Sequence, residues 1–220
     1  VVRRWLDPDG DGDPSDGVDG FRLDVAERVP LAFWRDFRRH VKAIHPQAFL
    51  VAELWWEKWP DHLLDPAPWL RGDVFDASMN YRWYVPVRSF VASAPPQRDS
   101  RQLAGELRAL LEGAHPDTVH VMMNVAASHH TPRLATSLAN SGKCKFRVNP
   151  RQNRDYRIGP ADETTRQLRT LLLVQQFTWV GAPHIWYGDE VGMWGADDPD
   201  CRKPMVWDDI EYEDETVGPH

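Results

Sequence analysis

The sequence predicts an α/β fold built on parallel strands. Five short runs rich in β-branched and aromatic residues alternate with longer segments of helical periodicity. Strands that alternate with helices favour a parallel sheet with right-handed crossovers, whose functional residues lie at the carboxyl ends of the strands. The pattern alone is compatible with an open doubly wound sheet and with part of a (β/α)₈ barrel, although the glycine-rich phosphate loop of a nucleotide-binding sheet is absent. The five runs are DGFRLDVA, QAFLVAELWW, GDVFDASMNY, TVHVMMNVA and APHIWYGDE.

Three of the intervening segments carry a clear helical stripe. The first lies between Pro30 and Pro46, which suit the start and the end of a helix. The other two are SRQLAGELRALLEG and ETTRQLRTLLLVQQFTWV. The predicted stripes are Trp34, Phe37, Val41 and Ile44 in the first helix, Leu103, Leu107, Leu110 and Leu111 in the second, and Leu168, Leu171, Leu172 and Gln175 in the third.

Composition indicates a soluble globular protein. Hydrophobic residues make up 42% and charged residues 27% of the 220 residues, and no uninterrupted apolar stretch approaches the ~20 residues of a membrane span. The net charge of -7 argues against nucleic acid as the main partner. One basic stretch, GKCKFRVNPRQNRDYR, is interpreted as a solvated loop, with phosphate binding as the alternative. We therefore expect neither nucleic acid nor a membrane as a partner.

The two cysteines bear on the cellular location. Cys144 and Cys201 lie far apart in the sequence and match no metal-binding spacing, which is typical of a reducing compartment. We therefore expect a cytoplasmic location. No signal peptide is visible, but the chain opens with VVRRWLDPDG and without an initiator Met, so we expect an upstream segment to be missing.

The first predicted strand contains two charged residues where an apolar run is expected. Arg22 and Asp24 share one face of FRLDV because the side-chain period of a strand is two. Burying a charge is costly unless it is paired, so we predict that these two side chains form an ion pair. A buried salt bridge that only fixes the strand register is the alternative interpretation.

A second carboxylate, Glu53, lies near the carboxyl end of the next predicted strand. Two carboxyl groups that face each other across a pocket are what glycoside hydrolysis needs, with retention at a separation of about 5 Å and inversion beyond about 6.5 Å. Arg22 should lower the pKa of Asp24, which suits a nucleophile. The apolar Trp55 and Trp56 should raise the pKa of Glu53, which suits a general acid. A solvated strand edge is the ordinary alternative for Glu53.

Two adjacent histidines follow the fourth predicted strand, in SHHTPR. Neighbouring side chains of an extended segment point to opposite faces, so we predict that His129 and His130 have different roles. A metal site that uses both rings and nearby carboxylates is the less favoured alternative. The sequence also contains eleven tryptophans, of which we expect one or two to stack on a sugar ring. The candidates are Trp55, Trp56, Trp59, Trp83, Trp186 and Trp194.

An aspartate-rich segment, DPDGDGDPSDG, precedes the first predicted strand. It places Asp7, Asp9 and Asp11 at positions one, three and five of a calcium loop, but position twelve is Val18 where a glutamate would be required. The segment is therefore either an Asp/Gly-rich turn or a structural calcium site. We expect the chemistry itself to need no cofactor.

Several of these segments together resemble the α-amylase family, glycoside hydrolase family thirteen. DGFRLDVA is similar to the segment that holds the family's nucleophile, and VAELWW to the one that holds its general acid. NVAASHHTPR resembles the segment that usually ends in His-Asp before Thr/Ser-Pro-Arg, and GAPHIWYGDEVGMWGADDPDCRKPMVW resembles the last barrel strand and its loop. The matches keep the family's order and span nearly the whole chain. The neopullulanase and cyclomaltodextrinase group is the most similar branch.

The resemblance implies a fold, an activity and a role for each residue. The fold is a partial (β/α)₈ TIM barrel in which residues 1–220 form the carboxyl-terminal half, about strands four to eight, without the early strands and the C-terminal β-domain. The activity is retaining hydrolysis of an α-glucan or maltooligosaccharide, and a homodimer of the longer protein is left open. By position, Asp24 would be the nucleophile and Glu53 the general acid/base. Arg22 would orient Asp24, and His129 would donate a hydrogen bond to the reacting sugar.

One position departs from the family pattern. His130 lies where the family has its third carboxylate, which hydrogen-bonds the reacting sugar and favours its distorted form. An imidazole cannot supply a pair of acceptor oxygens, and an imidazolium is repelled by an oxocarbenium-like centre. We therefore predict impaired activity, lower by on the order of 10³-fold. The alternative is a catalytically silent carbohydrate-binding protein.

Overall fold

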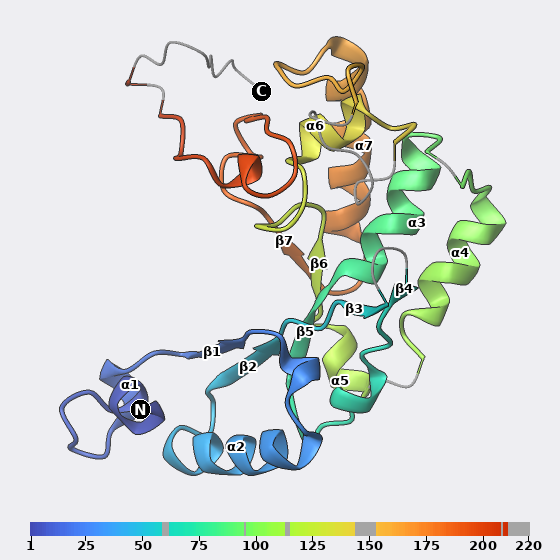
Figure 1. Cartoon of the computed structure of the whole chain (residues 1–220). Helices are drawn as coiled ribbons and strands as arrows, with labels where there is room; N and C mark the ends of the chain where they lie inside the picture. The colour runs from blue at the N-terminus through green and yellow to red at the C-terminus, as the bar shows by residue number, and fades with distance from the viewer. Residues whose placement is uncertain (59–61, 95, 113–114, 144–152, 208, 211–220) are drawn as a thin grey trace. The chain divides into compact units, whose positions relative to one another are not determined.

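The chain folds into two compact units in the computed structural model (Figure 1). Unit 1 joins Val1–Asn80 to Leu111–Met123, and unit 2 joins Tyr81–Leu110 to Asn124–His220. The structure describes residues 1–58, 62–94, 96–112, 115–143, 153–207 and 209–210. Residues named above that lie outside this description are Trp59, Cys144 and, from the basic stretch, Lys145, Arg147 and Arg151.

Three parallel strands form the centre of unit 1. β1 (Gly20–Leu23) pairs with β2 (Phe49–Ala52), and β2 pairs with β5 (Ala77–Asn80). The register places Leu23 beside Ala52, so the residues that follow them, Asp24 and Glu53, leave the sheet at the same end. The unit also contains α1 (Val2–Leu6), α2 (Leu31–Ile44), α5 (Pro116–Val119) and an antiparallel hairpin of β3 (Trp56–Lys58) and β4 (His62–Leu63). Short 3₁₀ helices, Pro14–Asp16, Ala26–Arg28 and Ala67–Trp69, lie in its loops.

Helix α2 supplies one side of the hydrophobic core of unit 1. As predicted, it follows Pro30 and ends before Pro46, and Trp34 and Val41 from its apolar stripe are buried. The indole of Trp34 lies edge-on to Phe75, with ring centroids 5.2 Å apart, and its Nε1 donates a 2.8 Å hydrogen bond to the carbonyl of Ala26. A buried tryptophan of this kind contributes both apolar area and a satisfied polar group.

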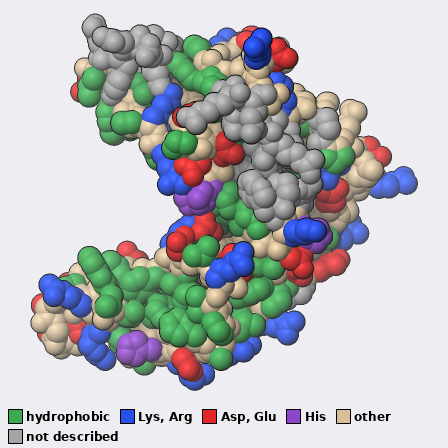
Figure 2. Space-filling view, viewed as in Figure 1, with side chains coloured by type: hydrophobic (Ala, Val, Ile, Leu, Met, Phe, Trp, Pro, Cys, Tyr) green, Lys and Arg blue, Asp and Glu red, His purple; other side chains and the backbone are tan. Residues whose placement is uncertain are grey.

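Part of the hydrophobic surface of unit 1 is exposed. Trp5 is 57% exposed and Phe33 is 52% exposed, and the ring of Phe33 stacks on Phe37 with centroids 6.3 Å apart. Figure 2 shows hydrophobic side chains gathered over α1, β1 and α2. β1 is the end strand of the sheet in the described part of the chain. An open strand edge beside an apolar face is a surface that folded proteins usually cover.

Unit 2 is built mainly from helices. α3 (Tyr81–Val91) packs against α4 (Ser100–Ala109) and α7 (Glu163–Thr178), and α7 also packs against α6 (Leu134–Ala139). Side chains from all four helices form the core of this unit, which includes Trp83, Leu107, Leu138 and Leu172. None of the helices that the structure describes is long and apolar enough to cross a membrane.

Two short strands complete unit 2, and a glutamine links them. β6 (Met123–Val125) begins at the last residue of unit 1, and β7 (Ala182–His184) is its neighbour in the sheet. The buried Gln176 of α7 donates from Nε2 to the carbonyl of Asn124 at 2.7 Å and to that of His184 at 3.0 Å. All five predicted strands are therefore present, as β1, β2, β5, β6 and β7.

The helix predictions were correct in position but not in every detail. In α7 the predicted stripe is confirmed for Leu172, which is buried, and for Leu168, which packs against the core, but it is wrong for Leu171, which is 57% exposed. The other buried residues of α7 are Thr165, Arg169 and Gln176. Helix α3 was not predicted, because it contains Pro86 and is buried on most of its surface, which removes the amphipathic pattern.

Candidate active site

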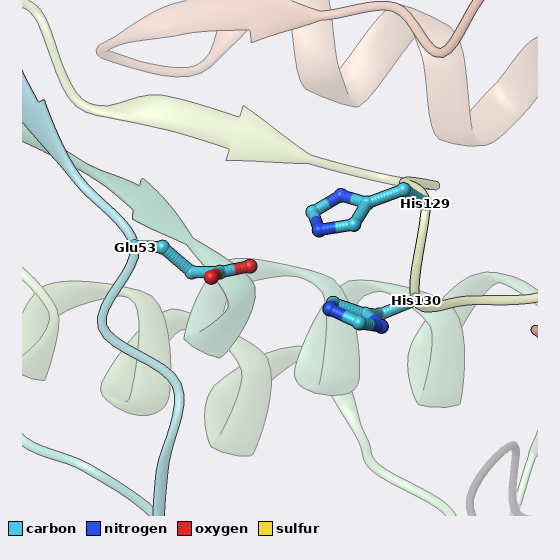
Figure 3. A group of neighbouring side chains, drawn as sticks. All are labelled: Glu53, His129 and His130. Atoms are coloured by element: carbon cyan, nitrogen blue, oxygen red, sulfur yellow. The ribbon is translucent and has the colours of Figure 1, made fainter. Parts of the chain in front are cut away.

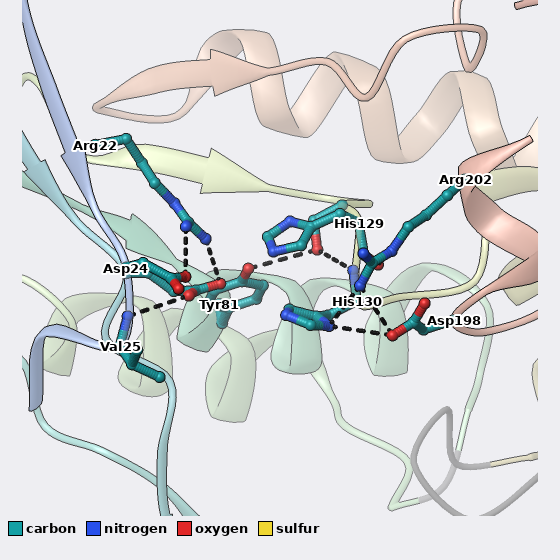
Figure 4. A network of polar contacts seen from close by, with 10 residues as sticks. Arg22, Asp24, Val25, Tyr81, His129, His130, Asp198 and Arg202 are labelled. Carbon is teal, nitrogen blue, oxygen red and sulfur yellow. Dashed lines mark hydrogen bonds and ion pairs between the residues drawn. The ribbon is translucent and has the colours of Figure 1, made fainter. Parts of the chain in front are cut away.

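An ion pair lies at the carboxyl end of β1. Nη1 of Arg22 is 2.6 Å from Oδ1 of Asp24, which confirms the predicted pairing. Figure 4 marks this contact with a dashed line. The expectation that the pair is buried is wrong, since the side chains are 34% and 68% exposed. The reason is that β1 is an end strand and stops at Leu23, so Asp24 lies just beyond the sheet.

The same guanidinium also contacts the second carboxylate. Nη2 of Arg22 is 2.6 Å from Oε1 of Glu53, whose side chain is buried. The backbone between the two strands supports this carboxyl group: Val25 adopts a left-handed conformation with a φ of 42°, and its N–H donates to Oε2 of Glu53 at 3.5 Å. A β-branched residue in this region is strained by roughly 1–3 kcal/mol, which is typical of functional sites. One cation thus holds both carboxyl groups at the end of adjacent parallel strands.

The surroundings of Glu53 favour its protonated form. Burial is the main cause that raises its pKa, and a hydrogen bond with Asp24 raises it further, while the charge of Arg22 lowers it. The predicted direction is confirmed. Trp55 and Trp56 follow directly and stack on each other, with ring centroids 4.9 Å apart and an interplanar angle of 25°. When one member of a carboxyl pair has a raised pKa, that member can act as a general acid while the other remains ionised.

The two histidines lie within a tight turn that follows β6 (Figure 3). The backbone N–H of Ser128 donates to Oγ1 of Thr131 at 2.7 Å, and the N–H of Thr131 donates to the carbonyl of Ser128 at 3.2 Å. The rings of His129 and His130 consequently lie 4.0 Å apart, with an interplanar angle of 43°. The prediction that they point to opposite faces is wrong, because it assumed an extended segment. Within unit 2 the structure brings the two rings together.

A loop after β7 contributes two polar partners for His130, as Figure 4 shows. Nδ1 of His130 is 3.7 Å from Oδ2 of Asp198 and 3.4 Å from Nη2 of Arg202. Sequence reasoning missed both residues. Their signal was the acidic and basic pair spaced four residues apart in DPDCR, directly after a predicted strand, where functional loops of parallel sheets lie.

A buried ion pair supports the loops that follow β6 and β7. The side chain of Arg133 is fully buried, and its Nη1 donates to the carbonyl of Tyr187 at 2.5 Å and lies 3.8 Å from Oδ1 of Asp189. Asp189 also accepts a 3.4 Å hydrogen bond from the backbone N–H of Leu134. Burial raises the pKa of Asp189 to about 7, against the opposing effect of Arg133. These contacts connect the segment that follows the two histidines to the segment that follows β7.

The aspartate-rich segment brings three carboxylates together. One oxygen from each of Asp7, Asp9 and Asp11 lies within 4.8 Å of the others. Asp7 is buried, whereas Asp9 and Asp11 are exposed. Oxygen donors of this kind suit a hard cation such as Ca²⁺. In the structure the same groups accept backbone N–H bonds, from Asp11 to Asp9 at 3.1 Å and from Asp13 to Asp11 at 2.7 Å, as in an ordinary Asp turn.

Comparison with known proteins reveals related enzymes. The chain is 36% identical to neopullulanase 2 of Thermoactinomyces vulgaris, over 96% of its own length and 29% of that protein. It is 40% identical to a cyclomaltodextrinase of Thermoanaerobacter pseudethanolicus, over 87% of its own length and 28% of that protein. The chain thus spans less than a third of each of these curated relatives.

Solved structures give the same result. The ligand-free cyclic α-maltosyl-(1→6)-maltose hydrolase of Arthrobacter globiformis superposes with a TM-score of 0.68 at 32% identity, over 94% of this chain and 37% of that one. The model of the α-amylase catalytic domain matches residues 1–216. With the parallel strands and intervening helices described above, these matches show that the chain belongs to the α-amylase family and forms part of its (β/α)₈ barrel.

Proposed function

We propose that the chain is the carboxyl-terminal half of the catalytic barrel of a retaining glycoside hydrolase that acts on α-glucans or maltooligosaccharides. The observation that carries the proposal is the contact of Asp24 and Glu53 with one guanidinium, that of Arg22, at 2.6 Å each. The relatives named above, a neopullulanase and a cyclomaltodextrinase, make this substrate class the natural choice.

The two carboxyl groups have complementary roles. Asp24 is the nucleophile that attacks the anomeric carbon, because the charge of Arg22 favours its ionised form. Glu53, whose pKa is raised mainly by burial, donates its proton to the leaving oxygen and then activates water. The two carboxyl groups are close enough to share a hydrogen bond, and a short separation between them favours retention over inversion.

The histidines have unequal roles in this proposal. His129 donates a hydrogen bond to the sugar at the cleavage point. His130 takes the place of the family's third carboxylate and lowers the activity, because it cannot accept two hydrogen bonds from the sugar. The loss is on the order of 10³-fold if several kcal/mol of transition-state stabilisation disappear.

Release of reducing sugar tests the proposal. A protein with a complete barrel that contains this chain is assayed on cyclodextrin, pullulan and starch, together with its His130→Asp variant. We expect weak activity from the parent and a gain on the order of 10³-fold from His130→Asp. The double variant Glu53→Gln/His130→Asp is the control and should be inactive. A folded His130→Asp protein without activity on any of these glucans contradicts the enzymatic function.

A carbohydrate-binding protein without catalysis is the second candidate. It is favoured by His130, whose imidazole is engaged with Asp198 and Arg202 in place of a catalytic carboxylate. Calorimetric titration with maltohexaose separates the two functions. Binding by both the parent and His130→Asp, with no sugar release from either, supports the second candidate.

We also propose that the carboxylates of Asp7, Asp9 and Asp11 hold a structural calcium ion. The support is their convergence within 4.8 Å on a segment that leads into β1. Added Ca²⁺ should raise the melting temperature of the protein and leave that of Asp9→Asn/Asp11→Asn unchanged. Equal melting temperatures of the parent with Ca²⁺ and with a chelator would contradict the site.

A further inference from the structure

The loop after β7 is attached to the turn that holds the histidines. The backbone carbonyl of His129 accepts hydrogen bonds from Nε of Arg202 at 2.9 Å and from Sγ of Cys201 at 3.3 Å. Both donors belong to the short helix η4 (Asp200–Arg202). This attachment uses the backbone of His129 and does not depend on its ring.

The side chain of His130 adds a second attachment to the same loop. Its Nδ1 lies 3.7 Å from Oδ2 of Asp198 and 3.4 Å from Nη2 of Arg202, and these two partners are joined to each other at 2.9 Å. The three side chains are between 35% and 43% exposed, so water weakens each contact but does not abolish it.

The attachment is separate from the other anchors of the loop. At the start of the loop, the carbonyl of Gly195 accepts from the N–H of Arg133 at 3.1 Å, and the N–H of Gly195 donates to Oγ1 of Thr136 at 2.9 Å. Farther along, the hydroxyl of Tyr187 donates to the carbonyl of Lys203 at 2.7 Å and Nε1 of Trp186 donates to the carbonyl of Cys201 at 3.1 Å, but both residues belong to the segment that leads into this loop. The His130 contacts are thus made at the middle of the loop.

We propose that His130 is a latch that positions the loop Asp197–Lys203 against the turn after β6, acting through Asp198 and Arg202. The imidazolium form pairs with the carboxylate of Asp198. The neutral form accepts from the guanidinium of Arg202 through the same Nδ1. The ring of His129, another titratable group of unit 2, lies 4.0 Å away between centroids. The latch gives His130 a task that is independent of catalysis and of the proposed function.

Cys201 provides a reporter of loop opening. Its side chain is buried, and burial raises the pKa of its thiol to about 11, so reagents reach it only when the loop opens. The experiment measures the rate of thiol labelling in a Cys144→Ser background under native conditions. His130→Ala should raise the labelling rate of Cys201 about fivefold, as expected for the loss of partly exposed polar contacts. His130→Gln, which keeps an acceptor and a donor, should give a smaller increase.

Two controls make the test specific. Asp200→Asn removes a charge from the same short helix without touching any contact that is described above for His130, and it should leave the rate unchanged. Arg202→Ala should raise the rate at least as much as His130→Ala, because Arg202 also donates to the carbonyl of His129. The double variant should label more slowly than additive effects predict, because the two side chains belong to one network with Asp198. The proposal is overturned if Cys201 is labelled at the wild-type rate in both His130→Ala and His130→Gln. It is also overturned if the effects of the His130 and Arg202 substitutions on the labelling rate are fully additive.

Discussion

Nη2 of Arg22 lies 2.6 Å from Oε1 of Glu53, while Nη1 of the same guanidinium lies 2.6 Å from Asp24. One side chain therefore sets the electrostatic environment of both carboxyl groups. Its charge lowers the pKa of Glu53, but burial raises that pKa by more. A substitution of Arg22 is therefore expected to change the electrostatic environment of both carboxyl groups at once.

Removal of the Arg22 charge should extend the pH range in which Glu53 is protonated. In Arg22→Gln the lowering effect disappears, so the pKa of Glu53 should rise and the alkaline limb of the kcat/KM profile of the complete barrel should move to higher pH. Arg22→Lys keeps the charge and should leave the limb nearly in place, although kcat should fall about 10²-fold in both variants because the fork geometry is lost. Carbon-13 NMR titration of the Glu53 carboxyl checks the pKa directly. An unchanged limb and pKa in Arg22→Gln contradict this account.

Asp76 should contribute more to stability than a neighbouring exposed carboxylate. It lies 2.8 Å from Arg38 and 3.2 Å from Lys42 of α2, and it accepts a 2.9 Å hydrogen bond from the N–H of Leu50 in β2. Asp76→Ala should lower the free energy of unfolding by about 2–3 kcal/mol, because three partners lose their acceptor. Asp73→Ala, which removes an ion pair that is nearly half exposed, should cost less than ~1 kcal/mol. Urea denaturation measures both, and equal losses would refute the assignment.

Gly20 should be required for the pairing of β1 and β2. A Cβ at this position would lie 1.9 Å from the carbonyl oxygen of Phe49, its partner in the register. Gly20→Ala should therefore destabilise the fold by about 3 kcal/mol, since the backbones must separate. Gly105→Ala is the matched control, because a Cβ there meets open space on α4, and it should stabilise by about 0.5–1 kcal/mol. Thermal unfolding distinguishes the two, and a neutral Gly20→Ala would disprove the close approach.

Asp189 should make stability depend on pH. Its pKa is raised from 3.8 to about 7, so the folded protein holds this proton more tightly than the unfolded chain does. The stabilisation is complete below about pH 3.8 and is lost as the pH rises through 7, by up to about 4 kcal/mol. Relative to Asp189→Asn, the parent should therefore lose stability between pH 4 and pH 7 in urea titrations. Parallel stability profiles of the two proteins would contradict the raised pKa.

The sequence was sufficient for the elements whose pattern is local. The strand runs gave β1, β2, β5, β6 and β7, and two prolines marked the ends of α2. Helix α3 was not predicted, because burial around most of its surface leaves no polar face and because Pro86 lies within it. The stripe of α7 was wrong at Leu171 and incomplete, because periodicity alone gives no reason to bury Arg169 or Gln176, whose burial depends on tertiary contacts.

The sequence pointed to Arg22, Asp24, Glu53 and the two histidines, but not to Asp198 and Arg202 or to most of the contacts among these residues. Strand periodicity paired Arg22 with Asp24, but only the β1–β2 register shows that Glu53 reaches the same guanidinium. The two histidines were assigned to opposite faces because the alternation rule was extended past the end of β6. A hydroxyl-stabilised turn begins there, and its hydrogen bonds link positions three residues apart.

The turn after β6 also has an evolutionary consequence. Hydrogen bonds between Ser128 and Thr131 maintain its shape, and Oγ of Ser128 also accepts from the backbone N–H of His130. Because these bonds do not involve the imidazole of His130, that ring is not needed to form the turn. Substitution at position 130 can therefore alter chemistry while the backbone is preserved. A lineage can therefore exchange the residue at this position without losing the turn, and a single later substitution can exchange it again.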